Sequence, residues 1–339
     1  MKPLLAALGA ACLLAASGAE AADASLVAAA QKEGEVVWYT TQVLDHSRPL
    51  AAAFEKKYPA IKLSFSVLNA ADTAVRISNE VRAGRHAVDV FDGTTTVVPL
   101  KQEGIVLKWL PDTAKEYPPD RLDKEGYWIA TNISVLTPGF NTGLVPPGTK
   151  LSYETLLDPK WRGQIAWGGT PSTSAGPGFV ATVLAEMGEE KGMDYLRRFA
   201  KQKVANLTLS ANAVLQQVVL GEYALGLQLF NNQVAEAKKK GAPVAWTPLE
   251  PSTVVLNVLS VLKDAPHPNA GKLLVDFLTS KEGQAVFRDI DYVPAHPEVA
   301  PLDPTLAPDG GHFRARSFTP EQATSEMPRW KAVFDDLFR

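Results

Sequence analysis

A hydroxyl-rich loop leads directly into a helix-forming segment between residues 168 and 187. The loop reads GGTPSTSAGPG, so Ser172, Thr173 and Ser174 stand just before the apolar helical stripe that follows Gly178. The first N–H groups of a helix lack intrahelical acceptors and lie at the positive end of its dipole, which suits phosphate, carboxylate or carbonate. Ordinary helix capping is the alternative, because serine and threonine are common N-caps.

Further polar residues follow segments with strand-like sequences. Thr41 and Gln42 come after a β-rich run that ends at Thr40, and Asn231 and Asn232 come after an apolar run that ends near Leu229. In sheets with parallel strands, ligands collect at the carboxyl ends of the strands. Capping remains the alternative for one asparagine and for Ser210, which opens another helix. The predicted ligand-binding residues are Thr41, Gln42, Thr94, Thr95, Ser172, Thr173, Ser174, Ser210, Asn231 and Asn232.

Residues for catalysis or metal binding are poorly arranged in this sequence. The five histidines show no H-x-x-x-H spacing, and His267 and His296 stand in proline-rich segments, where we expect exposed side chains. The nucleophile motif G-x-S-x-G is absent from the sequence. We therefore expect no catalytic residue, no metal site and no cofactor, and we keep a secreted hydrolase only as a weaker alternative.

Strand and helix signals alternate along the chain. Three strand-and-helix repeats before residue 100, and a second set from 164 to 240, predict an α/β protein with mainly parallel sheets. The expected strands are 36–40, 61–67, 88–91, 127–131, 134–136, 164–167, 223–229 and 254–262. The expected helices are 47 to about 58, 73–82, 178–187, 193–200, 213–219, 233–240, two within 269–287, and 320–338.

The N-terminus has the pattern of a cleavable signal peptide. Lys2 precedes the apolar run 4–16, and Ala19-Glu20-Ala21 matches the A-x-A cleavage pattern, so residues 1–21 are the expected signal and the protein is expected in the periplasm. Cys12, the only cysteine, falls inside this segment. The formal charge of −3, from 34 basic and 37 acidic residues, gives no sign of a nucleic-acid partner.

Several short motifs follow one another along the chain in a definite order. They are AAFEKKYP at 52–59, FNT at 140–142, LDPKWRG at 157–163, VVLGE at 218–222 and SKEGQ at 280–284. Their order resembles the family 1 extracellular solute-binding proteins of ABC importers, in the branch that includes the periplasmic ferric-binding proteins. The family's anion site lies at the place of the 168–178 loop. The resemblance also implies a membrane permease as partner and a monomeric protein.

The resemblance further implies a two-lobed, type II-like periplasmic binding protein fold. Each lobe would be a mainly parallel sheet flanked by helices, with hinge strands crossing near Phe140 and Val254 and the ligand held by hinge closure. The first lobe would contain residues 22–140 with 255–305. The second would contain 141–254 with the C-terminal helices.

The ferric-binding members carry an adjacent tyrosine pair ten residues after the glycine of the Gly-Glu motif. Counted from Gly221, these places hold Asn231 and Asn232, and Val43 stands where those proteins have a histidine. Neutral carboxamides are weak ligands for ferric iron, whereas phenolates are strong ones. We therefore predict a non-enzymatic importer component for a small solute that bears a phosphate, phosphonate or carboxylate. Iron bound through carboxylates and a synergistic anion is the alternative.

Overall fold

The computed structural model describes residues 23–146, 148–170, 172–308 and 312–339. The expected signal peptide, residues 1–21, lies outside the described residues. No helix in the described part of the chain is long and apolar enough to cross a membrane.

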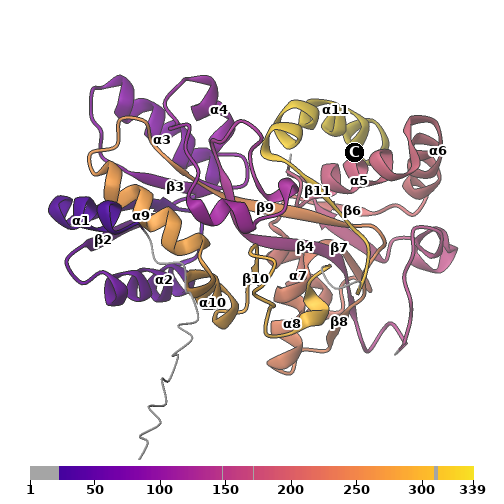
Figure 1. The fold of residues 1–339 in the computed structure, drawn as a ribbon. Helices are drawn as coiled ribbons and strands as arrows, with labels where there is room; N and C mark the ends of the chain where they lie inside the picture. Colours follow the sequence, from indigo (N-terminus) through magenta and orange to yellow (C-terminus); the bar gives the residue numbers. More distant parts are fainter. Residues whose placement is uncertain (1–22, 147, 171, 309–311) are drawn as a thin grey trace, which may run out of the picture.

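One mixed sheet runs through the whole molecule (Figure 1). Its main strands lie in the order β2-β1-β3-β9-β4-β7-β5-β6, while β8 and β10 pair with β4 and β11 pairs with β9. In the described residues the strands are β1 (Glu35–Thr40), β2 (Lys62–Val67), β3 (Val90–Gly93), β4 (Ile129–Asn141), β5 (Ile165–Gly168), β6 (Ala205–Leu207), β7 (Leu225–Phe230), β8 (Val244–Trp246), β9 (Ser252–Val261), β10 (Val293–Pro294) and β11 (Ala315–Phe318).

Helices flank this sheet at both ends (Figure 1). The α-helices are α1 (Ala24–Glu33), α2 (Leu44–Lys57), α3 (Ala70–Arg82), α4 (Val97–Gln102), α5 (Gly176–Met187), α6 (Glu189–Ala200), α7 (Ala211–Leu220), α8 (Asn231–Lys239), α9 (Pro268–Thr279), α10 (Lys281–Asp289) and α11 (Pro320–Phe338). Short 3-10 turns cover Asp112–Glu116, Pro119–Arg121, Thr155–Leu157, Pro159–Trp161 and Pro304–Leu306.

Two large hydrophobic cores lie on either side of the sheet's centre. The first gathers buried residues from Ala30 to Val135 and from Val254 to Phe313. The second gathers residues from Phe140 to Leu249 together with α11. Its centre is the fully buried Trp167, whose ring centroid lies 4.9–5.8 Å from those of Phe179, Phe199, Phe334 and Phe338. Each half therefore buries its own aromatic cluster.

Strands β4 and β9 connect the two halves. The end of β9, Val258–Val261, pairs with β3 in the first half, while residues 253–259 pair with β4. The end of β4 pairs in turn with β7 and β8 in the second half. The two-lobed α/β fold with crossing strands is thus confirmed, and Phe140 and Val254 lie in the crossing strands. The residue boundaries proposed for the lobes stay a prediction.

The strands are parallel, as expected, only within each half. Strand β1 is parallel to β2 and β3, and β5 is parallel to β6 and β7. The crossing strands run antiparallel to each other and to the strands that they join. This arrangement turns the carboxyl ends of β1, β3 and β5 toward the centre of the molecule, where a ligand between the halves would lie.

Two local expectations were wrong. The separate strands at 127–131 and 134–136 form the single strand β4, which is buried along nearly its whole length and has bulges near Ala130 and Thr137. His267 and His296 are not exposed side chains. The ring of His267 contacts the buried Asp89 at 3.1 Å, and His296 is 1% exposed with its Nε2 2.9 Å from Glu116. Both histidines hold loops onto the first core.

Candidate functional site: a cleft between the two halves

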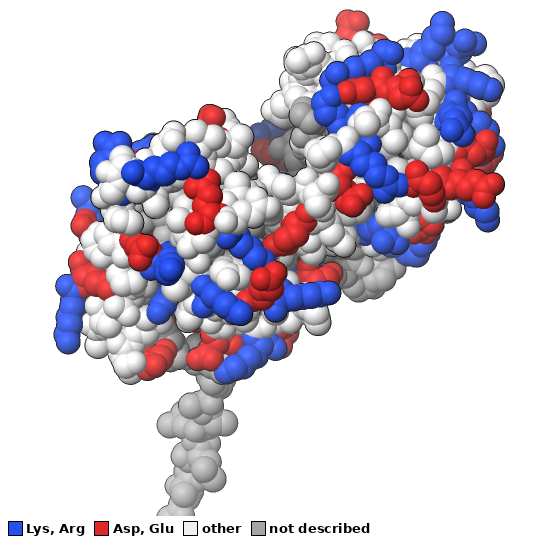
Figure 2. Space-filling model, turned by 90° about the horizontal axis from the view of Figure 1, so that it is seen from above, with Lys and Arg blue, Asp and Glu red and all other residues white. Residues whose placement is uncertain are grey.

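A cavity of about 730 Å³ lies between the halves, at the ends of the strands. Figure 2, which views the molecule from above, shows a hollow between the two halves and residues of both charges on the outer surfaces. The cavity is lined by Thr41, Gln42, Ala70, Thr94, Thr95, Asn132, Ser134, Ser172, Thr173, Ser174, Phe230, Val255, Asn257, Tyr292, Ala323, Thr324, Met327, Pro328 and Lys331.

The buried carboxylate of Asp92 holds the first wall of the cleft in place. Asp92 lies on β3, and its Oδ1 accepts hydrogen bonds from the backbone N–H of Thr41 at 2.7 Å and from the Thr41 hydroxyl at 2.6 Å. Its Oδ2 accepts from the Thr40 hydroxyl at 2.6 Å. Burial raises the pKa of the Asp92 carboxyl, although these hydrogen bonds oppose the rise. Asp92 is not among the lining residues of the cavity, and its carboxylate positions the end of β1.

The amides on this wall also bond to one another. Gln42 is almost fully buried, and its Nε2 donates to Oδ1 of Asn132 at 3.0 Å. Nδ2 of Asn257, on β9, donates to the Thr41 hydroxyl at 3.1 Å. The first wall is thus a rigid network of hydroxyls and amides that joins β1 to both crossing strands.

The hydroxyl-rich loop forms the second wall. The hydroxyls of Ser172 and Ser174 lie 2.9 Å apart, and the carbonyl of Thr173 accepts from Nε2 of Gln228 at 3.2 Å. Helix α5 begins at Gly176, and its N-cap is Ala175, which makes no side-chain cap bond. A side chain on Gly178 would place Cβ only 1.8 Å from the carbonyl oxygen of Thr173, so the loop folds closely over the helix start. Ordinary capping therefore does not account for these serines.

Helix α11 forms a third wall, and residues of this helix were not anticipated from the sequence. It crosses the start of α5, because a Cβ on Gly176 would lie 2.0 Å from the ring of Phe334. Lys331, one turn before Phe334, lines the cleft at this end and pairs with Asp335 on the same helix. Lys331 therefore lines the cleft on the helix that packs against the start of α5.

The first turn of α11 also reaches the other half of the molecule. Oε1 of Glu321 accepts from the indole N–H of Trp128 at 3.0 Å and lies 3.4 Å from the ammonium of Lys101. Trp128 belongs to the first core, whereas Trp330 and Phe334 of α11 belong to the second. Helix α11 therefore touches both halves as well as the cleft.

Seven of the ten predicted site residues line this cleft. The residues are Thr41, Gln42, Thr94, Thr95, Ser172, Thr173 and Ser174. That they bind a ligand stays a prediction. Their convergence follows from the parallel strands and from the loop before α5.

The structure does not bring Ser210, Asn231 or Asn232 into the cleft. Ser210 caps α7, and its hydroxyl accepts from the N–H of Ala213 at 3.3 Å. Asn231 is fully buried, and its Nδ2 donates to the carbonyl of Leu306 at 2.7 Å. Helix α8 begins at Asn231, one residue after β7, and so turns both asparagines away from the strand end.

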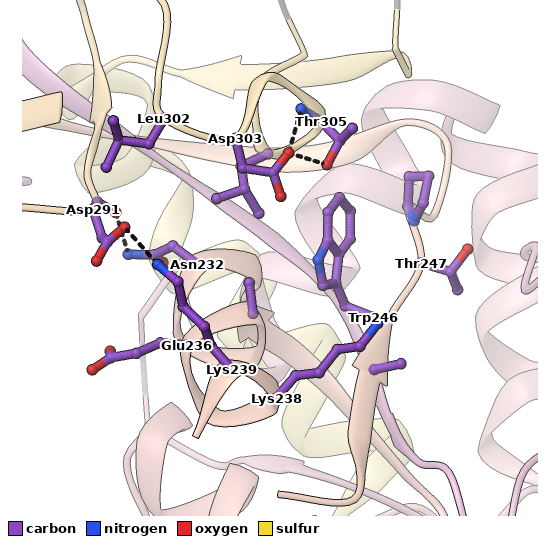
Figure 3. A pocket seen from close by; sticks show the side chains of 14 residues that line it. Asn232, Glu236, Lys238, Lys239, Trp246, Thr247, Asp291, Leu302, Asp303 and Thr305 are labelled. Atoms are coloured by element: carbon purple, nitrogen blue, oxygen red, sulfur yellow. Dashed lines mark hydrogen bonds and ion pairs between the residues drawn. The ribbon is translucent and has the colours of Figure 1, made fainter. Parts of the chain in front are cut away.

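Asn232 instead lines a different cavity of about 810 Å³, shown in Figure 3. This cavity lies between α8, the indole of Trp246 and the loop that carries Leu302 and Asp303. Lys239 lies 3.8 Å from Asp291 across its edge. None of the described residues that line this second cavity also lines the cleft between the halves.

Tyr292 is the one tyrosine among the described lining residues of the cleft. Burial is the main cause that raises the pKa of its phenol, and the nearby charge of Asp92 adds to it. Among the described residues there is no group of three or more histidine, cysteine, aspartate or glutamate side chains that could hold a metal ion. The described lining consists of hydroxyl, amide and apolar groups with one ammonium.

Solved structures share this fold along nearly the whole chain. Iron-bound HitA from Pseudomonas aeruginosa is 22% identical, with a TM-score of 0.73 over 89% of this chain and 99% of its own. AfuA from Actinobacillus pleuropneumoniae, in a structure with fructose-6-phosphate bound, is 22% identical, with a TM-score of 0.71 over 90% and 98%. IdiA (FutA) of Trichodesmium, in complex with iron and citrate, is 18% identical, with a TM-score of 0.75 over 90% and 100%.

Relatives are also found by sequence. An uncharacterized protein of Haemophilus influenzae is 25% identical over 275 residues, which are 78% of each chain. Iron uptake protein A1 of Synechocystis is 26% identical over 199 residues, and the match spans about half of each protein, 55% of this chain and 54% of the other.

The family model described as "Bacterial extracellular solute-binding protein" matches residues 88–314, which is most of the chain. The match includes both crossing strands and the loop that carries Ser172, Thr173 and Ser174. Members of this family bind solutes for ABC importers. This chain belongs to the bacterial extracellular solute-binding proteins.

Proposed function

We propose that this protein acts in the periplasm as a monomer that captures a small anionic solute between its lobes and delivers it to the permease of an ABC importer. The observation that carries the proposal is the end of the cleft where Ser172, Ser174 and Lys331 lie beside the start of α5. Hydroxyls, the positive end of a helix dipole and an ammonium favour the binding of phosphate, phosphonate or carboxylate oxygens.

The same lining argues for binding without chemistry. A serine nucleophile needs an adjacent base, but the hydroxyls of Ser172 and Ser174 bond to each other, and no histidine, aspartate or glutamate is among the described lining residues. Hinge closure around the ligand would exclude water from the anion and strengthen each hydrogen bond to it.

Iron remains the second candidate, because HitA is described as iron-bound and a Synechocystis relative is named as an iron uptake protein. Ferric iron prefers anionic oxygen ligands. Among the described lining residues, Tyr292 is the one side chain that could become an anionic oxygen ligand. Its raised pKa disfavours the phenolate form. Adding ferric citrate should give no phenolate-to-iron absorption band, and the appearance of such a band, lost again with a chelator, would favour iron.

The anion proposal predicts that a bound anion stabilises and compacts the protein. At a hundred times its dissociation constant, a ligand adds about 2.7 kcal/mol of stability, which should raise Tm by roughly 5 °C. Mass spectrometry of the native protein should identify the co-purified anion, and thermal shift and small-angle scattering should then respond to it. Stabilisation only by neutral or cationic solutes, with no response to any anion, would refute the proposal.

A further inference from the structure

Three amide side chains on the first wall of the cleft each use one end of the amide to bond within the protein. Nε2 of Gln42 donates to Oδ1 of Asn132 at 3.0 Å, and Nδ2 of Asn257 donates to the Thr41 hydroxyl at 3.1 Å. These amides lie just after β1 and on the crossing strands β4 and β9, and all three line the cleft. We call Gln42, Asn132 and Asn257 the amide triad.

The direction of the Asn257 amide is determined by its neighbours. The Thr41 hydroxyl lies 2.6 Å from Oδ1 of Asp92 and gives its hydrogen to this carboxylate, so its oxygen can only accept from Asn257. Nδ2 of Asn257 therefore faces Thr41, and Oδ1 is the end that remains. This Oδ1 is buried and has no hydrogen-bond partner among the described residues. A buried acceptor of this kind is costly unless a partner comes from outside the protein.

The other two amides of the triad also have one free end. Gln42 and Asn132 are each 2% exposed, and within the described residues Oε1 of Gln42 and Nδ2 of Asn132 bond to no protein group. The triad thus has two free acceptors and one free donor group. Water can bond these atoms while the cleft is open, but a ligand that displaced the water without replacing its bonds would leave them unpaired.

The cleft has room for a ligand body beyond an anionic head. Its volume of about 730 Å³ falls within the ~300–1,000 Å³ typical of pockets for whole small molecules, whereas a head group displaces only a few waters of about 30 Å³ each. Further hydroxyls line the same space, those of Thr94, Thr95, Ser134 and Thr324. A body that fills the cleft therefore meets hydrogen-bonding groups besides the triad.

We propose that the amide triad binds hydroxyl groups on the body of the solute, so that the solute is a hydroxylated anion. A hydroxyl group both donates and accepts, so it can donate to Oδ1 of Asn257 or Oε1 of Gln42 and accept from Nδ2 of Asn132. An ammonium group could only donate, and an apolar group could do neither. This inference rests on the proposed function, in which the anionic head lies at the loop of Ser172.

Two matched pairs of anions test the inference by calorimetry. Glucose 6-phosphate and cyclohexylmethyl phosphate share a head group and a six-membered ring, and gluconate and hexanoate share a carboxylate and a six-carbon chain. In the pair whose head group binds, we expect the hydroxylated member to bind at least tenfold more tightly than its apolar counterpart. Burial of an apolar body strengthens binding roughly ten- to 150-fold, but each of the three amide atoms that it leaves unpaired weakens binding roughly five- to 150-fold.

The same measurements separate this inference from the proposed function. A difference smaller than tenfold, a preference for the apolar member, or binding of inorganic phosphate alone overturns the inference and leaves anion capture intact. Failure of all four anions, of inorganic phosphate and of methylphosphonate overturns the proposed function itself.

Variants of the triad show whether these amides cause the preference. Asn257→Leu and Gln42→Met each replace an amide by an apolar side chain of similar size. We expect each to reduce the preference for the hydroxylated member about fivefold or more, because an apolar body no longer leaves that amide atom unpaired. The measured quantity is the ratio of two affinities, so a general disturbance of the cleft, which lowers both affinities together, does not imitate the result.

Asn232→Leu is the matched control, because Asn232 lines the other cavity, and it should keep the wild-type ratio. Circular dichroism establishes which variants fold, and if only one variant of the triad folds, its ratio decides the test. A wild-type ratio in every folded variant of the triad would mean that these amides do not contact the body of the ligand, and the inference would be wrong.

Discussion

Replacing Ser172 and Ser174 together by alanine is expected to weaken binding of the anionic ligand at least tenfold. A hydrogen bond to a charged group is worth about 1.5–3 kcal/mol, and 1.4 kcal/mol corresponds to a factor of ten. The two hydroxyls must give up their mutual bond of 2.9 Å when they turn to a ligand, so the loss should be smaller than two full bonds. Calorimetry with the co-purified ligand measures it.

Ser210→Ala is the matched control for this experiment. Ser210 caps α7 outside the cleft, so its removal should cost about 1 kcal/mol of stability and leave the affinity unchanged. The double variant of Ser172 and Ser174 should instead lose affinity and keep its stability, because neither serine caps helix α5. Wild-type affinity in the double variant would mean that the loop has no part in binding.

Lys331→Met is expected to reduce the affinity for the anion ten- to a hundredfold. Lys331 is the only lysine or arginine among the described lining residues, and its stem can remain packed as methionine while the charge is lost. Stability should change little, since an i,i+4 pair with Asp335 is worth about 0.3–0.5 kcal/mol and Asp335 keeps Arg339 at 2.9 Å.

The salt dependence of binding distinguishes a lost charge from a lost contact. Wild-type affinity should fall as sodium chloride rises from 50 to 500 mM, and the fall should be shallower in the variant, because screening weakens interactions between charges. Lys238→Met, in the other cavity, should behave like the wild type. Unchanged affinity and an unchanged salt dependence in Lys331→Met would show that the ligand does not contact this ammonium.

Features with local sequence signals could be predicted well. The strand that ends at Thr40, the helix from Pro320 and the loop at Ser172 all follow from short-range patterns of apolar, capping and hydroxyl residues. Strand β4 was divided wrongly because it is buried along nearly its whole length, so its sequence lacks the apolar and polar alternation that identifies a half-exposed strand. Its register depends on pairing with β9, which lies more than a hundred residues away.

The missed parts of the cleft depend on packing between distant segments. Lys331 and Met327 look like ordinary residues of an amphipathic helix, and tertiary contacts such as that between Phe334 and Gly176 bring that helix to the cleft. Tyr292 follows a helix end with no local sign of a site. The prediction for Asn231 and Asn232 placed them at a strand end before a helix at 233–240, but α8 starts two residues earlier, at Asn231. The directions of side chains in a strand-to-helix turn depend on where the helix begins.

The crossing strands also determine how the protein loses its structure. Residues 253–257 of β9 pair with β4 near the point where one core gives way to the other, so neither half can melt without breaking backbone hydrogen bonds of the other. We therefore expect the two aromatic cores to unfold as one cooperative unit, unlike domains joined by a flexible linker. A cavity opened around Trp167 would lower the melting temperature of the whole chain, including the distant network that holds Thr41.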